Sequence, residues 1–127
     1  STGYVGSKGN DTSIQENYIE VGGNYNFTLD ISLSNVFKIS PTENFSIDFL
    51  VGGTLQNNKT TTYVVVISQG ATAYKPTTVS LDGGVKSVLW QGGIVPAGNP
   101  NKTDTISFTL LKLPSGTTVL GQLIGFG

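Results

Sequence analysis

The sequence contains five Asn-x-Ser/Thr acceptor sequons, none with Pro at the middle position. Their asparagines are Asn10, Asn26, Asn44, Asn58 and Asn101. In exported proteins the side-chain amide of such an Asn is the acceptor for an N-linked glycan. The sequence therefore predicts an N-glycosylated protein that lies outside the cell, at the cell surface. The alternative is that a chain rich in Asn and Thr contains these sequons by accident.

The residue types that are missing restrict the chemistry further. The chain has no Cys, His, Met or Arg. It therefore lacks the thiolate nucleophile, the usual general base near neutral pH, and the common nitrogen and sulfur metal ligands. Seven Lys against eight Asp and Glu give a net charge of −1, with no basic block that would suit a nucleic acid. We expect no enzyme, no cofactor and no nucleic-acid partner.

One cluster of oxygen-bearing side chains resembles a calcium loop. It consists of Asn99, Asn101, Thr103 and Asp104. Calcium prefers several oxygen ligands, and usually more than the one carboxylate that this cluster offers. A hydrogen-bonded turn before a strand uses the same residue types. We therefore expect a turn here and no metal site.

Paired carboxylates are the second candidate for chemistry, because a glycosidase uses one as acid and one as base or nucleophile. The acidic residues available for such a pair are Glu16, Glu20, Asp30 and Asp48. Asp30 and Asp48 alternate with apolar residues, which predicts that both lie on a solvent-facing side of a strand. A solvated role is therefore the favoured interpretation.

Two further residue types have both a functional and a structural interpretation. Trp90, the only Trp, could stack on a sugar ring, although a place in the core or at a sheet edge is its more ordinary role. Lys38 and Lys112 could each form an isopeptide crosslink with an Asn, as in some immunoglobulin-like pilins. No spacing in the sequence selects a Lys, an Asn and an acid for this reaction.

The elements that must position these residues are strands, because the apolar period along the chain is two. Residues 25–34 alternate apolar and polar side chains, and residues 45–51 repeat the pattern. This is the pattern of a half-buried strand. Asn26 and Asn44 fall on the polar side, where a sugar can be accommodated. Further strands are expected at residues 18–21, 62–68, 77–81, 85–90, 105–112 and 117–126.

Turn residues separate these strands, and helix signals are absent. Asp82-Gly83-Gly84 suits a tight hairpin because Asp and Gly tolerate positive φ, and residues 22–23 and 114–116 suit turns as well. We predict an all-β protein, an antiparallel immunoglobulin-like sandwich of about eight strands over residues 16–127. Residues 1–15 are polar and Gly-rich and predict a flexible N-terminal arm. Its apolar points are Tyr4, Val5 and Ile14.

The C-terminal segment is apolar on both faces of its predicted strand. One face carries Val119 and Leu123, and the other carries Leu120, Ile124 and Phe126. Such a strand should be covered on both sides, because an exposed apolar strand at an edge pairs with other chains. We expect these side chains to be buried, either in the sandwich of their own chain or against a neighbouring subunit.

Together, the Gly/Thr/Asn-rich sandwich, the five sequons, the lack of Cys and Arg, and the polar arm resemble archaeal extracellular filament and surface-layer-associated proteins. The resemblance is to the thread-type pilins of thermoacidophilic archaea. It implies a homopolymer used in adhesion, in which an arm from one subunit, here residues 1–16, fills the incomplete sandwich of the next. The C-terminal strand is the other candidate donor, since the arm has few large alternating side chains.

The chain is also similar to the exported β-sandwich domains that anchor an archaellum or pilus. That resemblance implies a membrane-tethered domain with a binding function, whose partner is a surface-layer protein. A hydrophobic helix upstream in the precursor would favour this interpretation.

Overall fold

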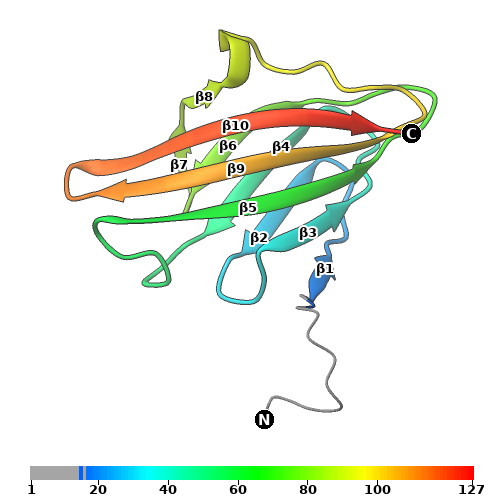
Figure 1. Cartoon of the computed structure of the whole chain (residues 1–127). Helices are drawn as coiled ribbons and strands as arrows, with labels where there is room; N and C mark the ends of the chain where they lie inside the picture. Colours follow the sequence, from blue (N-terminus) through cyan, green and yellow to red (C-terminus); the bar gives the residue numbers. More distant parts are fainter. Residues whose placement is uncertain (1–14, 16) are drawn as a thin grey trace.

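The computed structural model describes residue 15 and residues 17–127 (Figure 1). The predicted arm, with Tyr4, Val5 and Ile14, and the sequon at Asn10 lie outside these residues. The strands are β1 (Tyr18–Glu20), β2 (Asn26–Asp30), β3 (Val36–Ile39), β4 (Phe45–Leu50), β5 (Lys59–Ser68), β6 (Pro76–Leu81), β7 (Gly84–Lys86), β8 (Val88–Trp90), β9 (Thr103–Leu113) and β10 (Gly116–Phe126), with a 3₁₀ turn, η1, at Gln91–Gly93. No helix that could span a membrane is found among the residues described.

The strands form two mixed sheets that enclose one core (Figure 1). The six-stranded sheet has the order β1-β3-β5-β9-β10-β8, and the four-stranded sheet has the order β2-β4-β6-β7. From β1 to β6 the chain alternates between the two sheets, so that each of β2, β3, β4 and β5 is the crossover between two parallel strands of the other sheet. Parallel neighbours need such a long crossover, and here a strand supplies it in place of a helix.

The expectation of a purely antiparallel sandwich is therefore wrong. Antiparallel pairing occurs in β5–β9, β9–β10 and β6–β7, whereas β1–β3, β3–β5, β2–β4, β4–β6 and β8–β10 are parallel. The all-β class and the two packed sheets are as predicted, but the immunoglobulin-like topology is not confirmed. Apolar alternation does not distinguish the two pairings, because side chains alternate with period two in both.

The core consists of the inward-facing residues of both sheets. Phe27, Phe45 and Phe49 come from the four-stranded sheet, and Phe37 and Phe108 come from the six-stranded sheet; all are at most 1% exposed. The rings of Phe49 and Phe108 meet edge to face across the two sheets, with centroids 5.3 Å apart. Buried alternation thus explains why these segments form strands, as the sequence predicted for β2 and β4.

The outer faces of the two sheets differ in character. On β2, β4 and β6 the outer face carries Asn, Ser, Thr and Asp side chains. On the six-stranded sheet a row of Thr and Ser along β9 faces outward, and Thr62 Oγ1 lies 3.0 Å from Thr109 Oγ1 across the β5–β9 pair. Aliphatic side chains lie beside this row, including Val64 and Val66 on β5.

Residues 85–90 do not form the single strand expected from the sequence. The chain passes from β7 in the four-stranded sheet to β8 in the six-stranded sheet at Ser87. The hairpin before β7 is as predicted: Leu81 pairs with Gly84, and Asp82 and Gly83 both have positive φ, at 50° and 84°. Two positive φ values are typical of a type I′ turn.

The C-terminal strand β10 is only partly buried. Val119 is 1% exposed, and Leu123 packs against the core. Leu120, Ile124 and Phe126 point to the other side and are 38%, 44% and 54% exposed. The expectation that these three are buried in their own sandwich is wrong, because the six-stranded sheet has no third layer over its outer face in the described part of the chain.

Candidate functional site

The most unusual feature of the sandwich is an incompletely paired edge in each sheet. β8 pairs only with Val119–Gly121 of β10, so residues 122–126 have a strand on the β9 side alone among the residues described. In the other sheet β7 pairs only with Val79–Leu81 of β6, which leaves residues 76–78 with β4 alone. The two sheets are thus both incomplete on the side where β7 and β8 lie.

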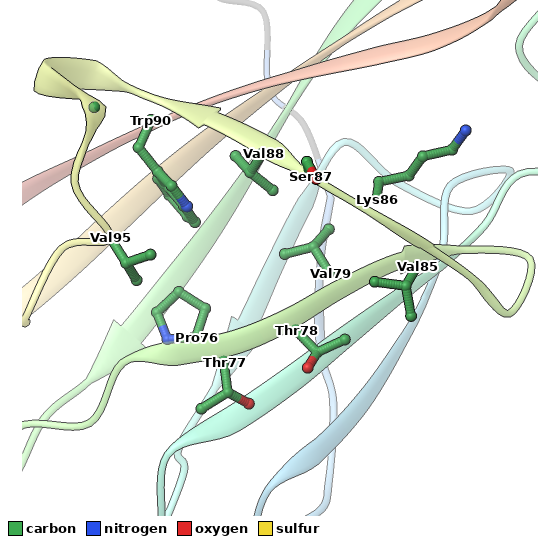
Figure 2. A pocket seen from close by; sticks show the side chains of 11 residues that line it. Pro76, Thr77, Thr78, Val79, Val85, Lys86, Ser87, Val88, Trp90 and Val95 are labelled. Atoms are coloured by element: carbon green, nitrogen blue, oxygen red, sulfur yellow. The ribbon is translucent and has the colours of Figure 1, made fainter.

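A hollow of about 350 Å³ lies between these incomplete edges (Figure 2). Pro76, Thr78 and Val79 of β6 line one side, and the ring of Trp90 and Val95 line the other. A second hollow of about 300 Å³ continues from Trp90 to Gln122 and Leu123 on β10. We call these two hollows together the edge groove. Most of its lining is apolar or hydroxyl-bearing, and its one charged side chain is Lys86.

Trp90 forms the inner wall of the edge groove. Its indole contacts the ring of Phe108 edge to face, with centroids 5.8 Å apart, and packs against the core. Gly121, opposite Trp90 in the β8–β10 pair, leaves the space that the ring occupies. Trp90 therefore lies at a sheet edge, which is the ordinary structural role expected as the alternative to stacking on a sugar.

The segment at residues 91–102 passes over the edge groove without pairing as a strand. Ile94 and Val95 on this segment are 76% and 43% exposed. Further along, Gly98 has φ +87°, and an added Cβ would lie 3.0 Å from the carbonyl oxygen of Tyr74. The segment is therefore fixed at its far end, whereas its apolar beginning is open to solvent.

The far end is held by Asp104, the one buried charged side chain in residues 17–127. Its carboxylate accepts hydrogen bonds from Asn99 N (2.9 Å), Asn99 Nδ2 (2.7 Å) and Gln69 Nε2 (3.1 Å). Gln69 also binds both backbone groups of Tyr74. The carboxylate is thus surrounded by donors, which is the opposite of what a calcium site needs. The cluster is hydrogen-bonded as expected, but only Asn99 and Asn101 precede the strand, because Thr103 and Asp104 already belong to β9.

The acidic residues considered for a glycosidase do not meet in a cleft. Asp30 and Asp48 lie on the outer face of the four-stranded sheet, Glu20 lies on β1 of the other sheet, and Glu16 is outside the described residues. The Ser32 hydroxyl and backbone N–H, which donate to Asp30, hold the pKa of that carboxyl below its usual value of 3.8. Asp48 accepts from Ser80 Oγ and Gly83 N. No group of three or more metal-ligating side chains occurs in the part of the chain described.

The lysines considered for a crosslink are separate from the buried acid. Lys38 lies on β3 opposite Glu20 and Val66, and Lys112 lies opposite Lys59. Neither is a hydrogen-bond partner of Asp104. The structure therefore brings together no trio of the kind that the isopeptide reaction uses among these residues.

The four described sequon asparagines are all exposed. Asn26 lies on the outer face of β2, and Asn44 directly precedes β4. Asn58 and Asn101 lie in turns before β5 and β9 and have positive φ, at 63° and 57°. None of these four lies on the outer face of the six-stranded sheet. These four sequons therefore place no predicted sugar on that face.

Comparison with protein-family models, with curated proteins and with solved structures found no match to this chain. Function is therefore inferred from the edge groove, the open strand edges and the sequons. The sequence contained one signal for the groove: the segment at residues 85–90 is much shorter than the segment at 117–126 and has the polar Ser87 in its middle. A strand that short cannot cover a neighbour of eleven residues.

Proposed function

We propose that this chain is a structural subunit of an extracellular, N-glycosylated filament that assembles head-to-tail by strand donation and serves in adhesion. The observation that carries the proposal is the open edge of β10 beside the edge groove. An unpaired strand edge presents a row of backbone donors and acceptors, and an extended segment can add to it as a further strand. The groove offers pockets for alternate side chains, which would set the register.

The segment before β1 is the better donor. β10 pairs with β9 along all eleven of its residues, so withdrawing it from its own sheet would break the largest strand pairing of the sandwich. Residues 1–16 contain Tyr4, Val5 and Ile14 as apolar points. Sixteen extended residues reach roughly 50 Å, whereas the free part of β10 at residues 122–126 is about 17 Å long. The segment is therefore long enough to reach a neighbour and fill its open edge.

The adhesive or lateral surface of such a filament would be the outer face of the six-stranded sheet. That face carries the exposed Leu120, Ile124 and Phe126, and none of the four described sequons lies on it. Sugar on Asn26 and Asn44 would instead cover the outer face of the four-stranded sheet and limit aggregation there, which a net charge of −1 does little to prevent.

The same face supports a second candidate function, a membrane-tethered domain that binds the surface layer or anchors an archaellum or pilus. A sheet face that carries none of the four described sequons and has exposed apolar side chains suits the docking of another protein. The two candidates differ in what the chain binds. The filament subunit binds copies of itself through the edge groove, and the anchor binds a surface-layer protein through the sheet face. A hydrophobic helix upstream in the precursor would favour the anchor.

The filament proposal is tested by deleting residues 1–15 and examining assembly by electron microscopy and sedimentation. We expect the deletion to remain monomeric, because the donor segment is lost. A deletion of residues 1–3 is the control and should assemble, because it keeps all three apolar points. A synthetic peptide of residues 1–15 should bind the deletion variant and shorten filaments of the full chain by occupying open grooves. Filaments of normal length from the 1–15 deletion would show that this segment is not the donor.

A further inference from the structure

The four described sequons are of two structural kinds, which differ in whether the side chain of the middle residue is buried or exposed. In the sequons of Asn26 and Asn44 the middle residues are Phe27 and Phe45, which are 1% and 0% exposed. In the sequons of Asn58 and Asn101 the middle residues are Lys59 and Lys102, and both are exposed. The first two sequons are therefore anchored in the core, and the other two are not.

The side-chain amide oxygens of the two anchored sequons are also engaged. Ser46 is the third residue of the Asn44 sequon, and its hydroxyl donates to Asn26 Oδ1 at 2.5 Å. Asn44 Oδ1 accepts from the backbone N–H of Lys75 at 3.1 Å. Asn26 and Ser46 are register partners in the β2–β4 pair, so this hydrogen bond joins the two sequons across neighbouring strands. Moving either segment out of the sheet breaks these bonds and withdraws a Phe ring from the core.

The two turn sequons lack these restraints. Asn58 and Asn101 are fixed by their backbone N–H groups, which donate to Lys112 O at 2.7 Å and Gly70 O at 2.8 Å. No side-chain hydrogen bond of either Asn is found among the described residues. Thr60 and Thr103, the third residues of these sequons, are exposed. Thr60 is the second residue of β5 and Thr103 is the first residue of β9, so an enzyme can reach the amide and the hydroxyl of each sequon when a strand end opens and the core stays intact.

From this difference we infer an order of modification: Asn26 and Asn44 can receive a glycan only before β2 and β4 enter the sandwich, whereas Asn58 and Asn101 can receive one before or after folding. The inference rests on the N-glycosylation part of the proposed function. In the transfer, a bond forms between Asn Nδ2 and C1 of a sugar carried on a polyprenyl phosphate. The bond from C1 to the phosphate oxygen breaks, its electron pair leaves with the phosphate, and the amide proton passes to the transferase.

The reason is access. A transferase must surround the acceptor amide and bind the hydroxyl two residues later, so the sequon has to leave its neighbours and enter the active site. For Asn26 and Asn44 this requires opening of the core, which is a rare event in a folded domain. For Asn58 and Asn101 it requires that a surface turn moves and that the first residues of β5 or β9 detach from their strand partners, while the core stays closed. The extent of glycosylation at Asn26 and Asn44 would therefore depend on whether transfer or folding is faster. The extent at Asn58 and Asn101 would not.

The test uses the full chain, produced without glycans and folded, together with four peptides that each contain one sequon, from residues 22–32, 40–50, 54–64 and 97–107. The transferase and its polyprenyl-linked oligosaccharide are chosen so that all four peptides are modified. Site occupancy over time is measured by mass spectrometry, and each site in the folded chain is compared with its own peptide. We expect Asn26 and Asn44 to be modified at least ~100-fold more slowly in the folded chain, and Asn58 and Asn101 to remain within ~10-fold of their peptides.

The variant Ser46→Ala gives a second measurement. It removes the Asn44 sequon and frees Asn26 Oδ1, but it leaves Phe27 in the core, so Asn26 should stay slow in the folded chain. Equal rates for Asn26 or Asn44 in the folded chain and in the peptide would overturn the inference. Rates at Asn58 and Asn101 that are as slow in the folded chain as those at Asn26 and Asn44 would also overturn it. Because no filament is involved, either result leaves the assembly proposal to its own test.

Discussion

The indole of Trp90 lies directly against the backbone of Gly121. A Cβ added to Gly121 would lie 2.6 Å from Cζ3 and 2.7 Å from Cε3 of the ring, and 2.9 Å from Cγ1 of Val88. Such distances are shorter than any allowed contact, so no side chain fits at position 121 with the ring in place. The pairing of β8 with β10 ends at this pair of residues, and the open edge of β10 begins at the next residue, Gln122.

We therefore expect Gly121→Ala to destabilise the chain by about 1–3 kcal/mol, the usual cost of overpacking a filled site. The added methyl group would displace Trp90 from Phe108 and weaken the β8–β10 pair. Urea unfolding followed by Trp fluorescence would measure both effects. Gly53→Ala is the matched control, because no atom lies within 4 Å of its added Cβ and its φ is not in the left-handed region. Equal stability of the two variants would contradict the role given to Gly121.

Asp104→Ala should lower the free energy of unfolding by about 1–3 kcal/mol, because it leaves part-buried donors without their acceptor. The donors concerned are Asn99 N, Asn99 Nδ2 and Gln69 Nε2. Hydrogen exchange should also show faster opening of residues 96–102 than of β4. Asp48→Ala, which removes a carboxylate from the outer face of the other sheet, is the comparison and should cost less. A larger loss in Asp48→Ala would argue against Asp104 as the fixed point of this segment.

Ser32→Ala should raise the pKa of Asp30 toward 3.8, because the Ser32 hydroxyl is the main cause of its lowering. A carboxyl whose pKa is lowered on folding adds stability that is present above its unfolded pKa and is lost as the pH falls through the folded pKa. The parent chain should therefore lose this contribution only below pH 3.8, and Ser32→Ala should lack most of it. NMR titration of the Asp30 carboxyl carbon would give both values. Ser34→Ala is the control, and an equal shift in that variant would refute the assignment.

Phe126→Ala should leave the stability of the isolated monomer within about 1 kcal/mol, because substitutions of exposed residues rarely have larger effects. Phe126 is 54% exposed, whereas Phe108 is fully buried. Phe108→Ala should cost about 3–5 kcal/mol, as is typical of a Phe removed from a core. Thermal unfolding of the monomer measures what Phe126 contributes to the fold, and the filament yield measures what it contributes to assembly. A loss of filaments in Phe126→Ala at unchanged monomer stability would place Phe126 at a contact between subunits. If neither the filament yield nor the monomer stability changes, Phe126 is not part of the proposed surface.

The strands in which apolar and polar residues clearly alternate could be predicted from the sequence. Phe27 and Leu29 are buried as the pattern at residues 25–34 predicted. β3 was not predicted, because residues 36–39 are too few for a periodic signal and lie between polar residues and Pro41. The pairing could not be predicted either, since parallel and antiparallel strands of a sandwich bury the same alternate residues.

At the candidate sites the residue types could be read from the sequence, but the surroundings of each side chain could not. Asp104 was assigned to a hydrogen-bonded turn before the strand, although it is in phase with Ile106, Phe108 and Leu110, and this phase was the available signal for its burial in β9. Leu120 and Ile124 were expected to be covered because they are apolar. Their exposure depends on the absence of a third layer in the described structure, which no local pattern of β10 could reveal.

The position of β9 between β5 and β10 has a consequence for how the chain folds as it is made. β5 contains five successive apolar residues, at positions 63–67, and one of its two edges is completed only by β9. During synthesis or export from the N-terminus, that edge stays open until residues 103–113 emerge. Stretches of this kind, long, β-branched and uncharged, are the ones that join cross-β aggregates. The risk of aggregation is therefore greatest before the sandwich is complete. A glycan at Asn58, if it is attached there as proposed, would place a bulky hydrophilic group immediately before the exposed strand during that interval.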